Sequence, residues 1–331
     1  MRPPKFWQNA PQNTGAVAQI LRPLGAVVAA MTARRVARAA KIRTKIPVLC
    51  VGNLGLGGAG KTPTVIALIT LCHELGLTPC VITRGYGGAL RGPLQVDPML
   101  HRAEDVGDEP LLIAAFAPVY MAKERAHAAQ LAQTSDADII IMDDGHQNPD
   151  VAKDMSLVVV DAARGFGNGL CAPAGPLREP VQTGLARADM LLSIGAEDVQ
   201  AQFTAHWGHQ IPCPHITAEL SVLQTGMDWA GTPVIAFAGI ADPDRFFTTL
   251  RGLGANVLRQ VALGDHQPLT PALMARLQKE AQLRGAQLVC TEKDAVRLPN
   301  SFRAHVIALP VRLDVKNPET IKSMVRKICV V

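Results

Sequence analysis

Short apolar runs alternate with longer helix-compatible segments from residue 46 onwards. Several of these runs are continuously apolar, which is typical of parallel strands that are covered on both faces. The predicted strands are residues 46–51, 78–83, 118–121, 138–142, 156–161, 188–194, 233–239, 256–261, 286–291 and 305–309. This alternation predicts an α/β fold with mostly parallel sheets.

Gly/Pro-rich breaks at residues 84–93 and 164–176 lie within the first half, and the stretch at residues 221–233 is a plausible domain boundary, because a new apolar strand follows it directly. A chain of 331 residues is long enough for two domains. We therefore expect two α/β/α domains, at residues 46–225 and 226–331, of which the C-terminal one is smaller. A helical arm at residues 1–45 precedes them.

The arm joins an apolar segment to a basic one. Residues 15–31 are mostly Ala, Val, Leu and Ile, interrupted by Gln19, Arg22 and Pro23, and residues 32–45 hold six basic side chains. The apolar part is shorter than the ~20 residues that span a bilayer, and it contains a charge. We expect an amphipathic helix in the membrane interface, with its basic end near anionic headgroups. The alternatives are a helix packed on the protein and a cleaved signal peptide.

Charge is distributed unevenly along the chain. Nine of the 33 Lys and Arg residues precede residue 46, whereas no acidic residue occurs before Glu74. The remainder carries 24 basic against 28 acidic residues, so the net charge of +5 comes from the arm. This concentration argues against a nucleic-acid partner, which needs a basic binding face. The seven cysteines are scattered without a C-x-x-C pair, which favours reduced thiols over a disulfide or zinc framework.

The glycine loop after the first strand contains the most informative motif. It satisfies G-x-x-x-x-G-K-[ST] through Gly55, Leu56, Gly57, Gly58, Ala59, Gly60, Lys61 and Thr62. A strand precedes the loop and a helical segment follows, which is the context of a phosphate loop. Its backbone N–H groups cradle phosphates, Lys61 can reach the β- and γ-phosphates, and Thr62 can ligate Mg²⁺. We expect ATP and Mg²⁺, and a cytosolic nucleotide argues against a signal peptide.

Two other nucleotide interpretations compete with this one. Gly55, Gly57 and Gly60 also satisfy the dinucleotide pattern G-x-G-x-x-G, but the next strand ends at Arg84 and not at an acid placed for a ribose. A GTPase would normally carry N/T-K-x-D, and the nearest string, residues 291–294, lacks the intervening residue. A nucleotide-binding module without turnover is a further alternative.

Two acids end the strand at residues 138–142. Asp143 and Asp144 are expected at the carboxyl edge of the sheet, near the nucleotide. In phosphate-loop proteins an acid at this place binds the Mg²⁺ between the β- and γ-phosphates. An Asp-Asp-Gly turn is the alternative, and the pattern does not tell which Asp would bind the metal.

Four further segments could contribute to the chemistry. Asp108 precedes a helical run, where it could cap the helix or act as a general base. Arg84 could hold a phosphate or belong to a flexible turn, and Arg178 and Glu179 could position a phosphate or metal or form a surface pair. His266 beside Asp265 could relay a proton or simply belong to a turn.

Seven segments together resemble one family, the tetraacyldisaccharide 4′-kinases of lipid A biosynthesis in Gram-negative bacteria. They occur in the family's order from the arm to about residue 297, at residues 51–54, 61–63, 84–88, 106–110, 143–145, 173–180 and 265–266. The resemblance implies an ATP-dependent kinase that phosphorylates the 4′-hydroxyl of a tetraacyldisaccharide 1-phosphate and yields lipid IVA. It also implies two α/β domains that face a cleft, and an N-terminal helix on the cytoplasmic face of the inner membrane.

The resemblance also implies roles for single residues. Asp108 becomes the expected base, with His266 as its partner and Lys61 as a catalytic cation. Asp143, Asp144 and Glu179 become candidates for Mg²⁺ or catalytic support, and Arg125 and Arg178 for phosphate contact. Many members continue Asp-Asp-Gly with an apolar or aromatic residue and then Gln-His, whereas residues 146–148 are His-Gln-Asn here. Many also show a second His or an aromatic residue after Asp-His, where Gln267 and Pro268 stand in this chain.

Overall fold

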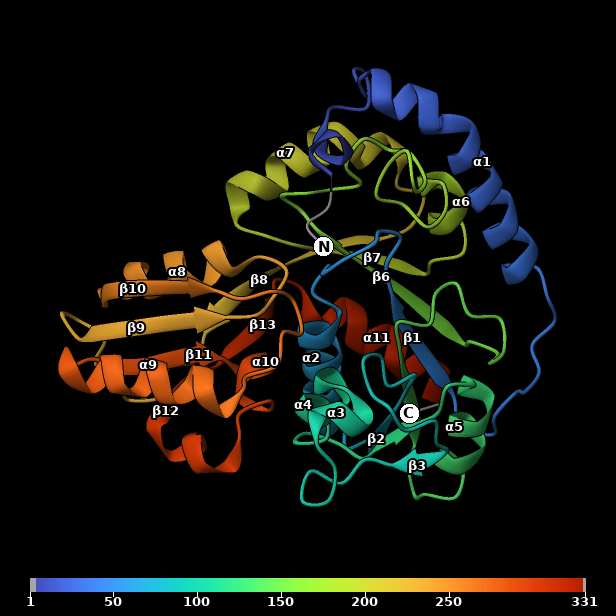
Figure 1. Cartoon of the computed structure of the whole chain (residues 1–331). Coiled ribbons are helices and arrows are strands. Elements are labelled where there is room, and N and C mark those ends of the chain that lie inside the picture. Colours follow the sequence, from blue (N-terminus) through green and yellow to red (C-terminus); the bar gives the residue numbers. More distant parts are fainter. Residues whose placement is uncertain (1–3, 330–331) are drawn as a thin grey trace.

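The computed structural model describes residues 4–329; residues 1–3 and 330–331, among them Arg2 of the basic arm, lie outside it. Two sheets with helices on both faces form a large unit and a small unit that lie side by side (Figure 1). The apolar helix α1 runs along the outside of the large unit. The predicted α/β class with mostly parallel sheets is confirmed.

Nine strands form the large sheet, in the order β13-β8-β7-β6-β1-β5-β2-β4-β3. The seven central strands are parallel, whereas β13 and β3 pair antiparallel at the two edges. Every residue of β1, β2, β5 and β7 is buried, as both faces are covered. The strand bounds are β1 (Val48–Gly52), β2 (Pro79–Thr83), β3 (Leu94–Gln95), β4 (Val119–Met121), β5 (Ile139–Asp143), β6 (Met155–Asp161), β7 (Met190–Ile194), β8 (His215–Val222) and β13 (Val311–Val315).

Alternate residues of the central strands belong to two cores. Leu49 and Val51 pack on the face that is covered by α2, α4 and α11. Val48 and Cys50 pack on the opposite face, beneath α5, and β6 and β7 meet α6 and α7 beside them. The helical elements are η1 (Lys5–Gln8), α1 (Ala16–Val36), α2 (Lys61–Glu74), α3 (Ala103–Val106), α4 (Asp108–Ile113), α5 (Arg125–Ala132), α6 (Val181–Leu185), α7 (Glu197–Trp207), η2 (Gly208–Gln210) and α11 (Pro318–Cys329).

The small unit is a four-stranded parallel sheet in the order β10-β9-β11-β12. Helix α8 packs on one face around Phe247, and helix α9 packs on the other around Phe237. Its elements are β9 (Pro233–Ala238), α8 (Pro243–Gly252), β10 (Asn256–Ala262), α9 (Pro271–Leu283), β11 (Gln287–Thr291), α10 (Glu292–Ala295), η3 (Asn300–His305) and β12 (Val306–Leu309).

All ten predicted strands are present, each within two residues of its expected ends. Three strands were not predicted, namely β3, β8 and β13. Strands β8 and β13 lie at one edge of the large sheet, and most of their residues are only partly buried or exposed. They therefore lack the continuous apolar run that marks the central strands.

The C-terminal segment differs from the expected domain range of 226–331. After β12 the chain returns to the large unit, where β13 pairs with β8, and Ile321 and Val325 of α11 enter the core around α2. The small unit is thus an insertion between two neighbouring strands. Its two connections run side by side, since the backbone N–H of Leu223 donates to the carbonyl of Pro310 at 3.0 Å.

Helix α1 is longer than the predicted apolar segment, with 21 residues that include Pro23. It is long and apolar enough to cross a membrane by length and composition, and it lies near the N-terminus. Ala18, Gly25 and Thr32 face the protein and are buried. A stripe of large apolar side chains on the other side is exposed, namely Val17, Ile20, Leu24, Val27 and Met31.

Gly25 sets how closely α1 approaches the large unit. A Cβ at this position would lie 2.7 Å from the carbonyl oxygen of Cys171, which is backbone and cannot turn aside. We expect Gly25→Leu to lower the free energy of unfolding by about 1–3 kcal/mol, the usual cost of overpacking. Ala26→Leu is the matched control, because Ala26 is exposed one position along the same helix. Equal melting temperatures of the two variants would contradict this packing.

Candidate functional site

A cavity of about 1080 Å³ lies between the two units. The large unit contributes the glycine loop, the carboxyl ends of its central strands and one side of α1. The small unit contributes the segment between β9 and α8, the residues around His266, and the start of α10. Residues 56–62 of the glycine loop all line this cavity.

The glycine loop has the backbone of a phosphate loop. Gly57 and Gly60 have φ angles of +113° and +89°, a region that L side chains rarely adopt. Helix α2 begins at Lys61, so its N-terminal N–H groups point toward the loop. The Lys61 ammonium lies 3.4 Å from Asn53 Oδ1 and 3.5 Å from Asp144 Oδ1. The loop, Lys61 and the acid that follows β5 therefore lie together at the carboxyl edge of the large sheet.

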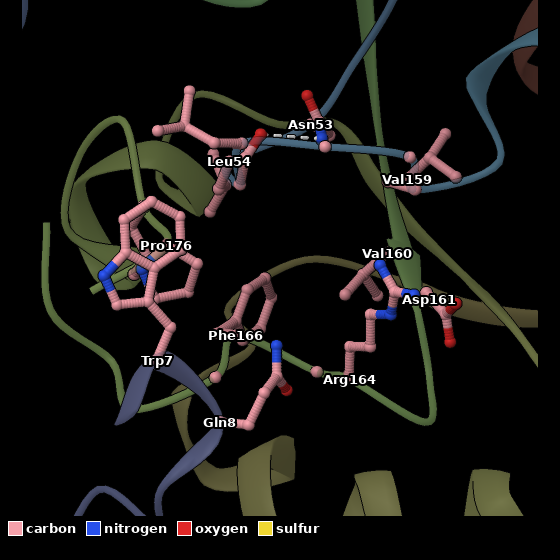
Figure 2. A pocket seen from close by; sticks show the side chains of 18 residues that line it. Trp7, Gln8, Asn53, Leu54, Val159, Val160, Asp161, Arg164, Phe166 and Pro176 are labelled. Atoms are coloured by element: carbon pink, nitrogen blue, oxygen red, sulfur yellow. Dashed lines mark hydrogen bonds between the residues drawn. The ribbon is translucent and has the colours of Figure 1, made fainter. Parts of the chain in front are cut away.

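A second segment, residues 164–178, holds the glycine loop in place from behind. The N–H of Leu56 donates to the carbonyl of Pro176, and the N–H of Arg178 donates to that of Leu54, both at 2.7 Å. Figure 2 shows Trp7 of η1 beside Pro176, in the wall of a small cavity of about 60 Å³ behind the loop. Trp7 Nε1 donates to the carbonyl of Pro173 at 3.0 Å. Our sequence reasoning missed this support, because η1 carries no periodic pattern.

Asp143 and Asp144 face the cavity in different charge environments. Burial raises the pKa of Asp143 to about 6, with a further rise from Glu109, and its carboxyl accepts a hydrogen bond from Thr83 Oγ1 at 3.2 Å. Burial also opposes ionisation of Asp144, but Lys61 and Arg178 outweigh it and hold that pKa below its ordinary value. Asp143 is therefore protonated more easily than Asp144.

Arg125, a predicted phosphate contact, binds the Asp-Asp turn itself. Its Nη2 donates to the carbonyl oxygens of Asp143 and Asp144 at 3.2 and 2.9 Å. The side chain is buried, and burial lowers its pKa. Arg125 reaches the cavity wall, but its contacts within residues 4–329 hold the backbone on which the two acids stand.

Glu179, a predicted metal ligand, lies beneath the acids and does not line the cavity. Its carboxylate accepts from Gln147 Nε2 at 2.9 Å and pairs with Arg187 at 2.9 Å. Gln147 in turn accepts from Arg178 at 3.2 Å, and Arg178 pairs with Asp144 at 3.0 Å. Glu179 is thus connected to the site only through other side chains. Among residues 4–329, no three His, Cys, Asp or Glu side chains form a metal-binding group.

Asp108 and His266, 158 residues apart, meet where the two units join; His266 lines the cavity, and Asp108 lies behind it. The imidazole Nδ1 lies 2.9 Å from Asp108 Oδ2, and the carboxylate is almost fully buried. Burial opposes ionisation of Asp108, but the His266 hydrogen bond and the charge of Lys293 hold its pKa below the ordinary value. The same hydrogen bond raises the pKa of His266. The backbone of His266 is in the left-handed region at φ +57°, a strained conformation of the kind found at functional sites.

The remaining lining residues were not all foreseen. Arg84, as expected, reaches the cavity from the end of β2, and it is exposed. Tyr86 in the same loop contacts His266 edge-on, with ring centroids 5.9 Å apart. Lys293 pairs with Glu109 at 3.1 Å, and neither residue was among our predicted site residues. Sequence reasoning weighed Lys293 only as part of a guanine-binding string.

Comparison with known proteins agrees with this geometry. A family model described as tetraacyldisaccharide-1-P 4′-kinase matches residues 17–329. A tetraacyldisaccharide 4′-kinase from Dinoroseobacter shibae is 55% identical, over 95% of this chain and 93% of the relative. One from Jannaschia sp. is 50% identical over 99% of each chain.

A crystal structure described as the "apo" form of LpxK from Aquifex aeolicus in complex with ATP has the same fold. It matches with a TM-score of 0.76 over 95% of this chain and 99% of that chain, at 23% identity. The family match and the identities over nearly the full length show that the chain belongs to the tetraacyldisaccharide 4′-kinase family.

Proposed function

We propose that this protein transfers the γ-phosphate of ATP to the 4′-hydroxyl of a tetraacyldisaccharide 1-phosphate, which yields lipid IVA. The observation that carries the proposal is one cavity that is lined by a phosphate loop on one side and by His266 on the other, with the buried Asp108 in contact with the His266 imidazole. Phosphoryl transfer requires charge neutralisation and alignment of the reacting oxygens, and these two sets of groups supply both.

The nucleotide would bind with its phosphates on the N–H groups of residues 55–60 and on the N-terminus of α2. Lys61 would neutralise charge on the β- and γ-phosphates. Asp144 holds the Lys61 ammonium from one side, and Arg178 competes for the same carboxylate. Phosphate oxygens that bind between Lys61 and Arg178 would replace the Asp144 carboxylate as the partner of these two cations.

The residues present fit Mg²⁺. Thr62 offers a hydroxyl, and Asp143 and Asp144 offer carboxylates in the same cavity, which are the oxygen donors that Mg²⁺ prefers. Mg²⁺ usually takes one or two carboxylates and completes its shell with phosphate and water, so a cluster of three protein acids is not required. The raised pKa of Asp143 reflects a buried negative charge without a full partner, which a cation would supply. When bound, Mg²⁺ would neutralise charge that develops on the transferred phosphoryl group.

Asp108 would orient the acceptor hydroxyl and take its proton. The carboxylate stays ionised at neutral pH although it is buried, because His266 and Lys293 compensate for the lost hydration. His266 Nδ1 is hydrogen-bonded to Oδ2 of the Asp108 carboxylate, and Oδ1 accepts a hydrogen bond from the backbone N–H of Glu109 at 3.0 Å. These contacts fix the side chain and leave lone pairs for a substrate hydroxyl.

Helix α1 would bring the lipid acceptor and the cavity together. Val28, Thr32 and Arg35 line the cavity, while the stripe from Val17 to Met31 is exposed. An exposed apolar stripe beside a basic segment suits a membrane surface with anionic headgroups. The acyl chains would remain in the bilayer as the sugar enters the cavity, on the cytoplasmic face of the inner membrane where ATP is present.

Purified protein with Mg-ATP and a labelled tetraacyldisaccharide 1-phosphate should give the 4′-phosphorylated product. We expect Asp108→Ala to lower kcat by about 10²-fold or more while nucleotide affinity is retained, since a positioned base contributes about that factor. Glu104→Ala is the control, an exposed acid four residues upstream. An absence of lipid transfer together with GTP turnover would refute the kinase assignment, and an unchanged rate in Asp108→Ala would refute the base.

The affinity for Mg-ATP should depend on pH through Asp143. Its pKa of about 6 means that the carboxyl becomes protonated as pH falls below that value, and a protonated carboxyl is a poor metal ligand. We expect calorimetric affinity at saturating Mg²⁺ to weaken between about pH 7 and pH 5. Asp143→Asn should bind weakly at both pH values, with little change between them. If wild-type affinity stays constant over this range, Asp143 is not a ligand.

Membrane association should depend on the exposed stripe of α1. We expect Ile20→Asp combined with Leu24→Asp to move the protein from the membrane to the soluble fraction, because charged side chains are costly in apolar lipid. Leu258→Asp with Leu283→Asp provides a matched control, as both leucines are exposed in the small unit. Equal sedimentation of both double variants with membranes would exclude the stripe as the anchor.

A further inference from the structure

Residues 291–294, which we call the cross-cleft turn, comprise the last residue of β11 and the first three residues of α10. Their sequence Thr-Glu-Lys-Asp is the string that partly resembles a guanine-binding motif. In the structure each of the four side chains is engaged by protein groups. The turn lies where the small unit meets the large one, and its first three residues line the cavity.

Thr291 and Asp294 anchor the turn within the small unit. The Asp294 carboxylate is completely buried and accepts from the N–H of Gly239 at 3.0 Å and from Thr291 Oγ1 at 2.6 Å. It also pairs with Arg297. These contacts tie the turn to Gly239 at the end of β9, and Ala241, two residues further on, lies close to Gly58 of the glycine loop. Asp294 is therefore not available to bind a guanine base.

Glu292 and Lys293 reach the large unit in two directions. Glu292 pairs with Arg312 of β13 at 2.9 Å and accepts from the N–H of Val311 at 3.1 Å. Lys293 points the other way, and its ammonium lies 3.1 Å from Glu109 Oε1 and 3.8 Å from Asp265 Oδ1. One short turn thus contacts both the strand beside the connections and the first turn of α4.

The first turn of α4 carries two consecutive acids, and the small unit engages both of them. His266 contacts Asp108, and Lys293 contacts Glu109. The buried Asp108 and the partly exposed Glu109 repel each other, and Asp143 adds a third negative charge close to Glu109. Lys293 is only about one-fifth exposed, so its charge acts with little screening by water. Its pKa is raised by Glu109, Asp108 and Asp265 even though burial opposes the charge.

We propose that Lys293 is a positioning residue for phosphoryl transfer, which holds Glu109 and thereby keeps Asp108 in place and ionised. The inference rests on the proposed function, because it concerns the base of that reaction. Lys293 does not need to contact substrate in this role; it acts through the two acids of α4. The cross-cleft turn makes this arrangement dependent on the small unit lying against the large one.

The charges around Asp108 come from four segments. Glu109 lies on its own helix, and Lys293, Arg297 and Asp294 belong to α10 and the residues after it. His266 and Asp265 approach from the loop after β10, and Tyr86 approaches His266 from the loop after β2. Arg297 lies 3.7 Å from Asp108 but is shared with the buried Asp294. Removal of Lys293 would therefore leave the negative charges of Asp108 and Glu109 with less compensation than removal of Arg297 would.

Lys293→Met tests the proposal in the purified full-length protein. We expect kcat for lipid phosphorylation to fall about tenfold or more, since small displacements of a catalytic group have effects of this size. The KM for ATP should change less than about twofold, because Lys293 does not bind the phosphate loop. The acidic limb of the pH–rate profile should move to higher pH, and Lys293→Arg should restore its position by returning the cation. If the acidic limb of the pH–rate profile lies at the same pH in Lys293→Met as in the wild type, the proposal is wrong.

Two control variants distinguish an effect of Lys293 on the position of Asp108 from a general loss of protein stability. Lys279→Met removes an exposed lysine of α9 and should leave rate and profile unchanged. Arg312→Met removes the ion pair between Glu292 and β13 but spares both acids of α4, so any loss of stability should leave the acidic limb in place. If Arg312→Met moves the limb as far as Lys293→Met does, the effect belongs to the contact between the units and the proposal is wrong.

A measurement without turnover keeps the proposal separate from the proposed function. Nitrogen-15 NMR titration of the His266 imidazole should show a higher pKa in Lys293→Met, since the nearby ammonium lowers that pKa in the wild type. An unchanged His266 titration would refute the inference about Lys293 whether or not the protein phosphorylates lipid. Failure of the wild type to phosphorylate the lipid would instead refute the proposed function.

Discussion

The buried carboxylate of Asp108 constrains the architecture around it. A buried charge that loses its partner destabilises a protein by about 3–5 kcal/mol, and the side-chain partners of Asp108, His266 and Arg297, both belong to the small unit. The large unit cannot bury this acid and keep it ionised by itself. Asp108 can therefore remain both buried and charged only while the two units are in contact. The side-by-side connections at Leu223 and Pro310 keep the two units within reach of each other.

Features that depend on local sequence could be predicted. The glycine loop is encoded by residues that can adopt positive φ, and the central strands by continuous apolar runs. The meeting of Asp108 with His266 had no local signal, and only the resemblance to a family pointed to it. Glu179 and Arg125 show the limit of that transfer, because motif membership does not reveal which neighbours a charged side chain engages.

The apolar pattern of the sequence did not predict the two strands at one edge of the large sheet, and the reason is physical. Strands β8 and β13 are covered less completely than the central strands, so their polar residues interrupt the apolar run. The break at residues 221–233 lies between β8 and β9, where the small unit begins, whereas the exit near Pro310 had no comparable signal. Helix α1 was found as an element and underestimated in length, because Arg34 and Arg35 continue a helix that the apolar pattern ends earlier.

The late return of the chain also bears on the order in which the protein folds. Strand β13 and helix α11 leave the ribosome after the small unit, yet Leu313, Ile321 and Val325 belong to the main core of the large unit. That core stays incomplete while the small unit, whose strands are all contiguous in sequence, can already form its own core. Synthesis therefore delivers the inserted unit as the first part able to close its core, and the core of the nucleotide-binding part becomes complete only after it.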